Sequence, residues 1–304
     1  MTTMTEGQVL PARMRRPITD EEIETFWRDG VVCLRSVIDT AWLESVAEPI
    51  ERVLASGRAS NLTEKIRKER AARADSEGND DVLEDVESTG AYYIALDAWR
   101  QQREIGSFAT RSMLPEIAAR VLRSSGVSIY TDQLLVKEPG AGTRTAFHVD
   151  EPYFIADGDQ ICTCWVPLDT VTLASGAMGY VRGSHRWTHN FKPNEFATGR
   201  AKASAMGDTN TVSLPDIDRN PDDFDLVYHE CEPGDMTIHH MRTAHGSGGN
   251  TTSGQRRRAL AIRYCGDDAV YRHKPTVPVD PSGGLISDGD RFDSCPLFPR
   301  VWGA

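Results

Sequence analysis

The first third of the chain carries apolar residues at helical spacing. Residues 39–56 predict an amphipathic helix, because their apolar side chains recur three or four positions apart and so share one face: Trp42, Leu43, Val46, Ile50, Val53 and Leu54. An earlier helix is predicted from the N-cap Thr19, the acidic residues that follow it and the stop at Asp29-Gly30. Residues 114–126 predict a further amphipathic helix.

From residue 127 onward the pattern changes to short runs that are typical of strands. They are rich in β-branched and aromatic residues and are bounded by Gly, Pro and Asp. The runs cover residues 127–140, 159–171, 176–185, 234–240 and 256–266. A helical first part and a strand-rich remainder predict an α+β fold, mainly β, in which N-terminal helices buttress an antiparallel barrel or sandwich.

The chain has a length suited to one large domain, which we expect to span residues 17–304. Residues 1–16 contain three arginines but no apolar core, which predicts a disordered leader rather than a secretory signal. An amphipathic transit peptide is the alternative. Insertions are predicted near residues 60–90, where charge is dense, and near residues 191–225, where turn residues dominate.

Composition narrows the class of partner. The net charge of −11 at pH 7 argues against a broad nucleic-acid-binding surface. No run of about 18 apolar residues occurs, so no membrane-spanning helix is expected. The cysteines are scattered, and Cys162 and Cys164 are poorly placed for a disulfide or a zinc knuckle, which favours reduced thiols in a cytoplasmic protein. We therefore expect a small-molecule substrate; the sequence carries no signal for oligomeric state.

The segment FHVDEPYF, residues 147–154, contains the strongest candidate chemistry. His148 and Asp150 would project to the same side of an extended strand, with Val149 turned away. His245 follows a predicted strand and precedes a Gly-rich turn, which makes its ring a candidate third ligand. Two histidines and one carboxylate form a facial set that suits non-haem Fe(II) and leaves coordination positions open.

Other residues compete for roles in this site. His239 and His240 are rivals for the third ligand, and one of them can support a ligand without binding the metal; we expect both to be core or surface residues. His185, in the GSHRW turn, is expected to pack or to form hydrogen bonds. Candidate lining residues of a substrate pocket are the nearby aromatics Tyr153, Phe154 and Trp187.

The arginine-rich run RRRALAIRY lies on the strand predicted downstream of the Gly-rich turn. Arginine binds a carboxylate through two parallel hydrogen bonds, which suits a co-substrate that is a diacid. Alternation along a strand places Arg257 on the opposite face from Arg256. Ala259 and Ala261 share the Arg257 face, as does Arg263, and the small residues would leave room for a slender diacid. Arg257 is therefore the preferred anchor, with Arg256 as the second candidate.

Taken in order, the motifs FHVD, GAMGYVRGSHRW and HGSGGN…RRRALAIRY, with the opening FWRDGVVCLRSVID, resemble the phytanoyl-CoA dioxygenase (PhyH) family of Fe(II)/2-oxoglutarate-dependent oxygenases. The resemblance covers roughly residues 17–275 and implies a double-stranded β-helix core, a cupin-like jelly roll. It also implies that His148, Asp150 and His245 hold Fe(II), with 2-oxoglutarate and O2 as co-substrates. The residues that match the family's co-substrate site are Arg257, for the distal carboxylate, and Ser247, Trp165, Gln133 and Lys137.

The resemblance implies a dioxygenase that hydroxylates a small or medium-sized organic metabolite while 2-oxoglutarate and O2 become succinate and CO2. The alternative is that the same metal and co-substrate carry out desaturation, epoxidation or epimerisation. Two other classes fit the three ligands alone: a divalent-metal hydrolase and a non-catalytic metal-binding scaffold. The arginine-rich strand argues against the hydrolase, because a hydrolase needs no anchor for a diacid. A non-catalytic scaffold would instead be marked by a broken triad or a filled pocket.

Overall fold

The computed structural model describes residues 10–73, 88–197, 199, 202, 210–274, 277 and 282–303. The α-helices in these ranges are α1 (Asp20–Asp29), α2 (Thr40–Ala55), α3 (Leu62–Arg73), α4 (Ala98–Gln101), α5 (Arg103–Arg111) and α6 (Leu114–Val121). The strands are β1 (Val31–Leu34), β2 (Ser60–Asn61), β3 (Tyr92–Leu96), β4 (Val127–Lys137), β5 (Thr145–His148), β6 (Ala156–Asp157), β7 (Ile161–Pro167), β8 (Met178–Val181), β9 (Leu226–His229), β10 (Met236–His240), β11 (His245–Ser247), β12 (Arg257–Cys265), β13 (Val270–Tyr271) and β14 (Arg300–Trp302). None of the described helices is long and apolar enough to cross a membrane.

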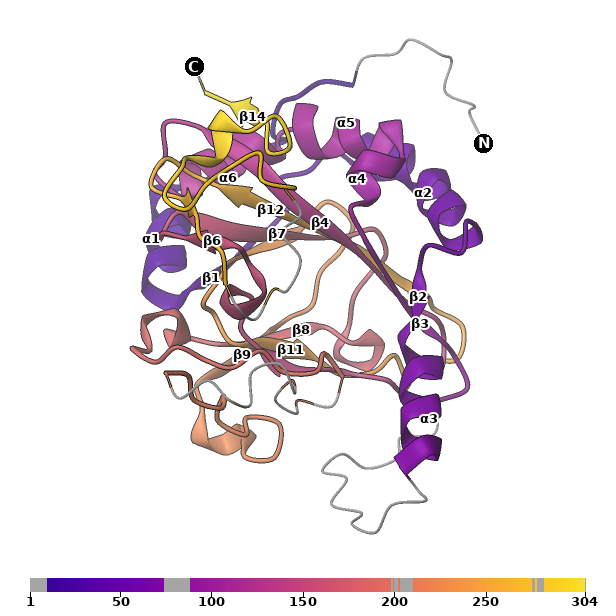
Figure 1. The fold of residues 1–304 in the computed structure, drawn as a ribbon. Coiled ribbons are helices and arrows are strands. Elements are labelled where there is room, and N and C mark those ends of the chain that lie inside the picture. The colour runs from indigo at the N-terminus through magenta and orange to yellow at the C-terminus, as the bar shows by residue number, and fades with distance from the viewer. Residues whose placement is uncertain are drawn as a thin grey trace.

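Two antiparallel sheets lie face to face and enclose the centre of the molecule (Figure 1). The larger sheet has the order β1-β10-β7-β12-β4-β3-β2, with β14 beside β4, and the smaller has the order β5-β11-β8-β9. β6 and β13 form a separate pair. Neighbouring strands come from distant parts of the chain, as in a double-stranded β-helix. The jelly-roll core expected from the sequence is confirmed.

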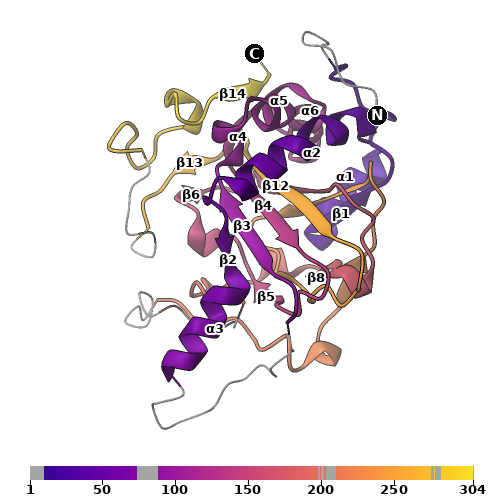
Figure 2. The same ribbon diagram turned by 90° about the vertical axis from the view of Figure 1, so that its right-hand side faces the viewer.

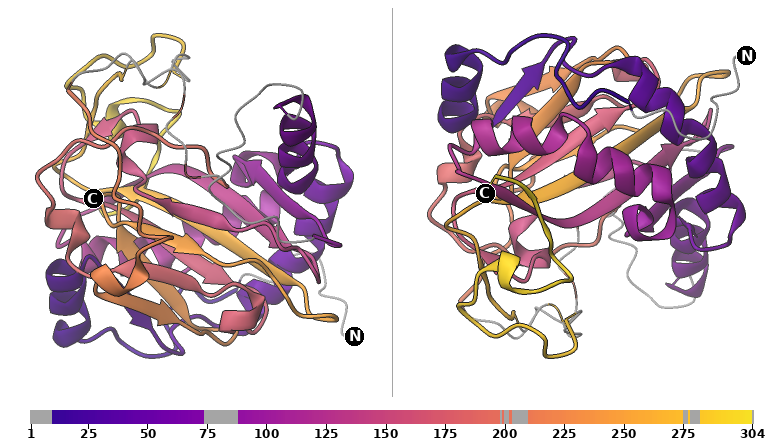
Figure 3. Two further views of the ribbon diagram at one scale, coloured as in Figure 1. Left: turned by 90° about the horizontal axis from the view of Figure 1, so that it is seen from below. Right: turned by 90° about the horizontal axis from the view of Figure 1, so that it is seen from above.

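Helices cover the outer face of the larger sheet. α2, α5 and α6 lie together on it, as the views from the side and from above show (Figures 2 and 3). Strand β12 shows why both faces are buried: Leu260 and Ile262 join the helix-covered core, whereas Ala259 and Ala261 face the smaller sheet. Period-two alternation thus separates an apolar layer from an inner face on which polar side chains can gather.

The helix signals are confirmed at the start of α1 and wrong at the end of α6. Thr19 caps α1: its hydroxyl accepts from the Glu22 N–H at 3.1 Å, and the Glu22 carboxylate accepts from the Thr19 N–H at 2.8 Å. The helix predicted over residues 114–126 stops at Val121, because Arg123 adopts left-handed backbone with φ of 54°.

Residues 10–16 contradict the predicted disordered leader. Leu10 and Met14 pack against the helix-covered core, and the Arg16 guanidinium pairs with a carboxylate of α1 at 2.6 Å. The prediction is therefore wrong for this stretch, while residues 1–9 lie outside the described part of the chain.

Both predicted insertions contain regular or buried structure. The first holds β2 and α3, a helix that extends away from the sheets at the lower right of Figure 1; residues 74–87 lie outside the described ranges. In the second, Phe191 and Ile217 are buried beside Phe147 of β5. The described parts of this second insertion thus pack against the smaller sheet.

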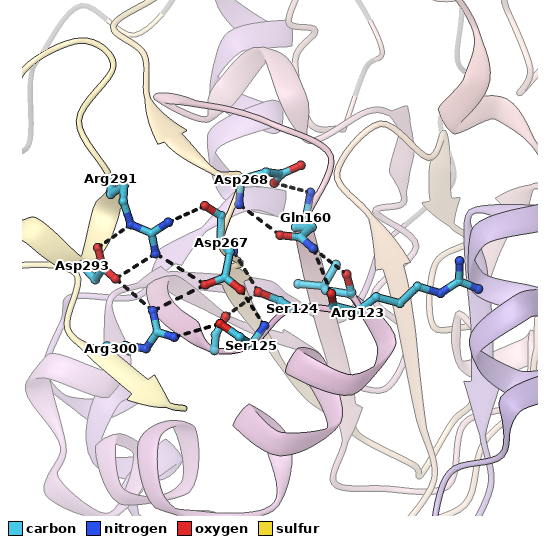
Figure 4. Close-up of polar contacts among 11 residues, drawn as sticks. Arg123, Ser124, Ser125, Gln160, Asp267, Asp268, Arg291, Asp293 and Arg300 are labelled. Carbon is cyan, nitrogen blue, oxygen red and sulfur yellow. Dashed lines mark hydrogen bonds and ion pairs between the residues drawn. The ribbon is translucent and has the colours of Figure 1, made fainter. Parts of the chain in front are cut away.

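The C-terminal segment is tied to the body by polar contacts among five residues, which we call the C-terminal clamp: Ser125, Asp267, Arg291, Asp293 and Arg300 (Figure 4). Asp267 accepts from the Ser125 N–H at 2.5 Å and pairs with Arg291 at 3.5 Å and with Arg300 at 3.6 Å. Asp293 pairs with both arginines at 3.0 Å. The clamp holds the aromatic residues of this segment against β4.

Asp267→Asn is expected to lower the free energy of unfolding by about 1 kcal/mol at pH 7, because the amide cannot pair with the two arginines. Burial opposes ionisation, but hydrogen bonds from Ser125, Ser124 and Arg291 hold the pKa of Asp267 below its usual range. The charge therefore stabilises the fold above the unfolded-state pKa of about 3.9, and this contribution is lost as the pH falls below it. Urea unfolding of both proteins between pH 7 and pH 3.5 measures the difference.

The matched control is Asp222→Asn, which changes an exposed carboxylate outside the clamp. It should leave the unfolding free energy unchanged. Equal losses in the two variants would contradict a specific contribution from the clamp.

Candidate metal and co-substrate site

Three side chains from separate segments meet between the two sheets. His148 ends β5, Asp150 follows it, and His245 begins β11. β5 and β11 are antiparallel neighbours, and their register places His148 opposite His245. One donor atom of each residue lies within 4.8 Å of those of the other two. The structure therefore brings together the three ligands predicted from the sequence.

Asp150 reaches this cluster through a turn, not through the extended strand that the sequence predicts. β5 stops at His148, and Asp150 has α-type backbone with φ of −73° and ψ of −30° at the start of η1 (Glu151–Tyr153). The Thr163 hydroxyl donates to Asp150 Oδ2 at 2.8 Å. The other carboxylate oxygen, Oδ1, lies 3.8 Å from His148 Nε2.

Backbone carbonyls orient both histidine rings. His148 Nδ1 donates to the Ala146 carbonyl at 2.9 Å, and His245 Nδ1 donates to the Thr243 carbonyl at 2.8 Å. Because Nδ1 carries the proton in each ring, Nε2 is left with a lone pair for a metal. Burial lowers the pKa of His148 to about 3 and that of His245 to about 4, so both rings are neutral at physiological pH.

Asp150 is kept ionised in a buried position. Burial alone would raise its pKa, but the guanidinium of Arg263 and the neighbouring histidines hold the pKa well below the usual range. Arg263 Nη2 lies 3.9 Å from Asp150 Oδ1 and donates to Gln133 Oε1 at 3.0 Å. Two neutral imidazoles and one carboxylate are thus ready to bind a metal, and this donor set fits Fe(II).

His239 lies beside the three ligands. Its ring is buried 4.3 Å from that of His245, and its Nε2 lies 3.7 Å from Asp150 Oδ2. Neither of its ring nitrogens has a hydrogen-bond partner among the described residues. His240 points to the opposite face of β10 and packs near Trp27, so the two rivals lie on different sides of the sheet.

Arg257 is buried at the far side of this interior. It is 1% exposed, and none of its three guanidinium nitrogens has a partner among the described residues. Its guanidinium carbon lies 5.6 Å from the ring centre of Trp165, whose indole N–H also lacks a partner. Burial lowers the pKa of Arg257, as expected for a cation with no anion beside it.

Lys137 adds a second buried cation next to Arg257. Its amino group donates to Ser247 Oγ at 2.9 Å and to the Gly248 carbonyl. Burial and the charge of Arg257 lower its pKa well below the usual value. No carboxylate pairs with either cation in the described part of the chain. The unfilled donors, and the small Ala261 beside them, fit a slender dicarboxylate such as 2-oxoglutarate.

Arg256 and Arg258 have different partners. Arg256 pairs with Glu51 of α2 at 2.7 Å and with Glu138 at 2.6 Å. Arg258 pairs with Asp169 at 2.7 Å. The alternation predicted for β12 is observed, and of these three arginines only Arg257 faces the metal ligands.

A larger cavity of about 580 Å³ opens beside the metal ligands. It is mainly apolar, and its lining is Ile94, Leu96, Asp97, Arg100, Tyr130, Thr131, Gln133, His148, Asp150, Tyr153, Phe154, Asn194, Phe196, Lys202, Arg263, Leu297 and Phe298. Tyr153 and Phe154 lie where the sequence predicts. Trp187 does not line the cavity; it packs on Phe191 and Phe224.

Several residues that line the larger cavity were not assigned to the site from the sequence. Alternation along β12 correctly places Arg263 on the same face as Arg257, but no role in the site was assigned to Arg263 from the sequence. Phe196 and Asn194 come from the second insertion, whose turn-rich sequence gives no sign of inward side chains. Asn194 is fixed there by hydrogen bonds from the Tyr153 hydroxyl at 2.7 Å and to the Phe147 carbonyl at 2.9 Å.

Comparison with known proteins identifies the family. The phytanoyl-CoA dioxygenase (PhyH) family model matches residues 26–259. The chain belongs to this family. A probable phytanoyl-CoA dioxygenase of Caenorhabditis elegans is 30% identical over 154 residues, 48% of this chain and 45% of that protein. A probable alpha-ketoglutarate-dependent hypophosphite dioxygenase of Stutzerimonas stutzeri is 27% identical over 192 residues, 62% of this chain and 59% of that protein. The chain spans about half the length of the curated relatives that it matches.

Solved structures share the fold of this PhyH-family protein along most of its length. The non-heme alpha ketoglutarate dependent carbocyclase SnoK from nogalamycin biosynthesis has a TM-score of 0.67 at 23% identity, covering 93% of this chain and 96% of that one. The epimerase SnoN from the same biosynthesis has a TM-score of 0.68 at 21% identity, covering 94% and 96%. At these identities the likeness establishes the fold.

The buried histidines should make the metal-free PhyH-family protein sensitive to acid. Because the folded-state pKa values of His148 and His245 are about 3 and about 4, the unfolded chain binds more protons than the folded one below about pH 6.5. Stability therefore falls as the pH drops. His148→Asn should reduce the slope of the unfolding free energy against pH by up to about 1.4 kcal/mol per pH unit, as measured by urea unfolding from pH 7 to pH 5.

His189→Asn is the control, because His189 is exposed and is not one of the three candidate metal ligands. Its slope should equal that of the unmodified protein. A His148→Asn protein with an undiminished slope would show that His148 is not held as a buried neutral ring.

Proposed function

We propose that the protein is an Fe(II)- and 2-oxoglutarate-dependent oxygenase that hydroxylates a small or medium-sized organic metabolite. The observation that carries the proposal is the buried Arg257, whose donors are unfilled and which lines the same narrow cavity as His148, Asp150 and His245. A metal site alone is compatible with a hydrolase or a scaffold. A metal site with a buried, unpaired guanidinium beside it calls for a co-substrate that binds the metal at one end and carries an anion at the other.

In this proposal His148, Asp150 and His245 would hold Fe(II) through two imidazole nitrogens and one carboxylate oxygen. The metal and 2-oxoglutarate together supply the activation of O2, with succinate and CO2 as by-products. Arg257 binds the distal carboxylate of 2-oxoglutarate bidentately. The other residues assigned to the co-substrate are Ser247, Lys137, Trp165 and Gln133, which surround the same narrow cavity or touch its lining.

The remaining protein groups orient the ligands and exclude water. Thr163 fixes one oxygen of Asp150, so that the other faces the metal position. The Phe196 ring lies 5.2 Å from that of His148 and covers it from the side of the second insertion. Tyr153 and Phe154 continue this wall into the larger cavity, where we place the substrate. A dry wall around the metal limits side reactions with water.

Other oxidative outcomes remain alternatives within the same chemistry. The solved structures of similar fold include a carbocyclase and an epimerase, so this scaffold accommodates more than hydroxylation. The outcome depends on how the substrate lies against the metal, which the cavity walls control.

An anaerobic titration of metal-free protein with Fe(II) and 2-oxoglutarate tests the proposal. A visible charge-transfer band is expected when the keto acid chelates the bound metal. Arg257→Gln should weaken 2-oxoglutarate binding at least about 30-fold, about 2 kcal/mol, because it removes buried charge-assisted hydrogen bonds. His148→Ala should abolish the band.

Arg256→Gln is the matched control, since it removes the adjacent arginine, which pairs with Glu51 and Glu138 instead. This variant should bind 2-oxoglutarate as tightly as the unmodified protein. If metal binds tightly but no band forms at any 2-oxoglutarate concentration, the oxygenase assignment fails and the hydrolase or scaffold takes its place.

A further inference from the structure

Arg263 stands between the two cavities. It is 7% exposed, and it lines both the narrow cavity that contains Arg257 and the larger cavity of about 580 Å³. Arg257 lines only the narrow one. The two arginines are six residues apart on β12, roughly 20 Å at about 3.3 Å per residue. They therefore approach the metal ligands from opposite ends, and Arg263 comes from the side of the larger cavity.

The hydrogen-bonding capacity of Arg263 is largely unused. A guanidinium has five N–H donors. One bond is observed, to Gln133 Oε1, and the buried Nε has no partner among the described residues. The closest carboxylate oxygen among the described residues, Asp150 Oδ1, is 3.9 Å away, within ion-pair range but beyond hydrogen-bond distance, and Asp150 belongs to the cluster that could hold a metal. A buried cation with free donors at the edge of a cavity calls for an anionic acceptor from outside the chain.

The other acidic residue that lines the larger cavity does not supply the anionic acceptor for Arg263. Asp97 accepts from the Thr131 hydroxyl at 2.9 Å and lies 3.9 Å from Arg100 Nε, so it already has its own partners. The rest of the wall is mainly apolar. Tyr130 packs against Phe154 and Phe298 with ring centres 5.1 Å and 5.7 Å apart.

We propose that Arg263 binds a carboxylate of the substrate, and that the apolar, ring-containing body of the same molecule fills the cavity walled by Tyr130, Phe154 and Phe298. The inference rests on the proposed function, because it places the substrate in the larger cavity beside the metal. The planar fork of arginine suits bidentate binding of a carboxylate. Since Arg263 adjoins Asp150, the carbon that is oxidised lies within a few bonds of that carboxylate.

Two molecules can supply a carboxylate to Arg263: the substrate, as proposed, and 2-oxoglutarate, through its metal-binding carboxylate. The two sources differ in what Arg263→Gln changes. Loss of a contact to the co-substrate weakens 2-oxoglutarate in the anaerobic titration. Loss of a contact to the substrate leaves that titration within about threefold of the unmodified protein, less than 1 kcal/mol, and removes a preference for acids over amides.

Matched probes measure this preference. Protein loaded anaerobically with Fe(II) and 2-oxoglutarate is dialysed to equilibrium against 4-phenylbutyrate, 2-naphthylacetate and dehydroabietate, and against the primary amide of each. At least one acid is expected to bind at least about 30-fold more tightly than its amide, about 2 kcal/mol. Arg263→Gln should reduce the affinity for that acid to the level of the amide, and Arg263→Lys, which keeps the charge, should restore part of the preference.

Arg182→Gln serves as the control, because Arg182 is on the surface and pairs with Asp225; it should keep the full preference. Acids and amides that bind equally, a preference that survives in Arg263→Gln, or the absence of binding by any of the acids would each overturn the inference. A failure of the charge-transfer band in the unmodified protein would instead overturn the proposed function, so the two failures are distinguishable.

Discussion

The interior between the two sheets holds more positive charge than its own carboxylates neutralise, and the arrangement of the site depends on this imbalance. Arg257 and Lys137 lie at one end and Arg263 at the other, and Asp150, 3.9 Å from Arg263, belongs to the cluster that could hold a metal. An unpaired buried cation is costly unless an anion reaches it. The fold offsets this cost through the apolar packing on the outer face of the larger sheet. In the proposed function, the anionic co-substrate and substrate restore this balance when they bind.

The sequence allowed those parts of the site to be predicted that follow from local geometry. Alternation along β12 separates Arg257 from Arg256 without any knowledge of the fold, and the observed partners agree: Arg256 reaches Glu51 on the outer side, while Arg257 faces inward. The pairing of β5 with β11 was not predictable from spacing alone. The sequence placed His148 in an extended segment and His245 after a predicted strand, but the register that sets them opposite each other comes from the fold.

Prediction failed where distant parts of the chain decide the local structure. Asp150 occupies a turn whose N–H groups bond to the carbonyl of Met241, a residue about 90 positions away, so local alternation could not place it. The order of residues 10–16 depends on their packing against α2 and its neighbours, and their composition gives no sign of this. Likewise, no sequence pattern indicates that the C-terminal segment brings Phe298 against Tyr130 to close one wall of the larger cavity.

The molecule therefore has two parts in which side chains are held in place in different ways. The metal ligands and the proposed co-substrate anchors belong to, or directly adjoin, sheet strands whose register fixes them, and a shift by one residue would turn each side chain to the wrong face. The larger cavity is walled instead by the second insertion and the C-terminal segment, which are held by a few polar contacts, such as those of Asn194 and of Asp267. Changes there can alter the shape of the cavity without moving the metal. Arg263 lies where the two parts meet: its backbone is fixed in β12, while its guanidinium reaches the cavity. In the proposed function the strand thus fixes one polar group of the substrate, while the second insertion and the C-terminal segment contact the rest of it.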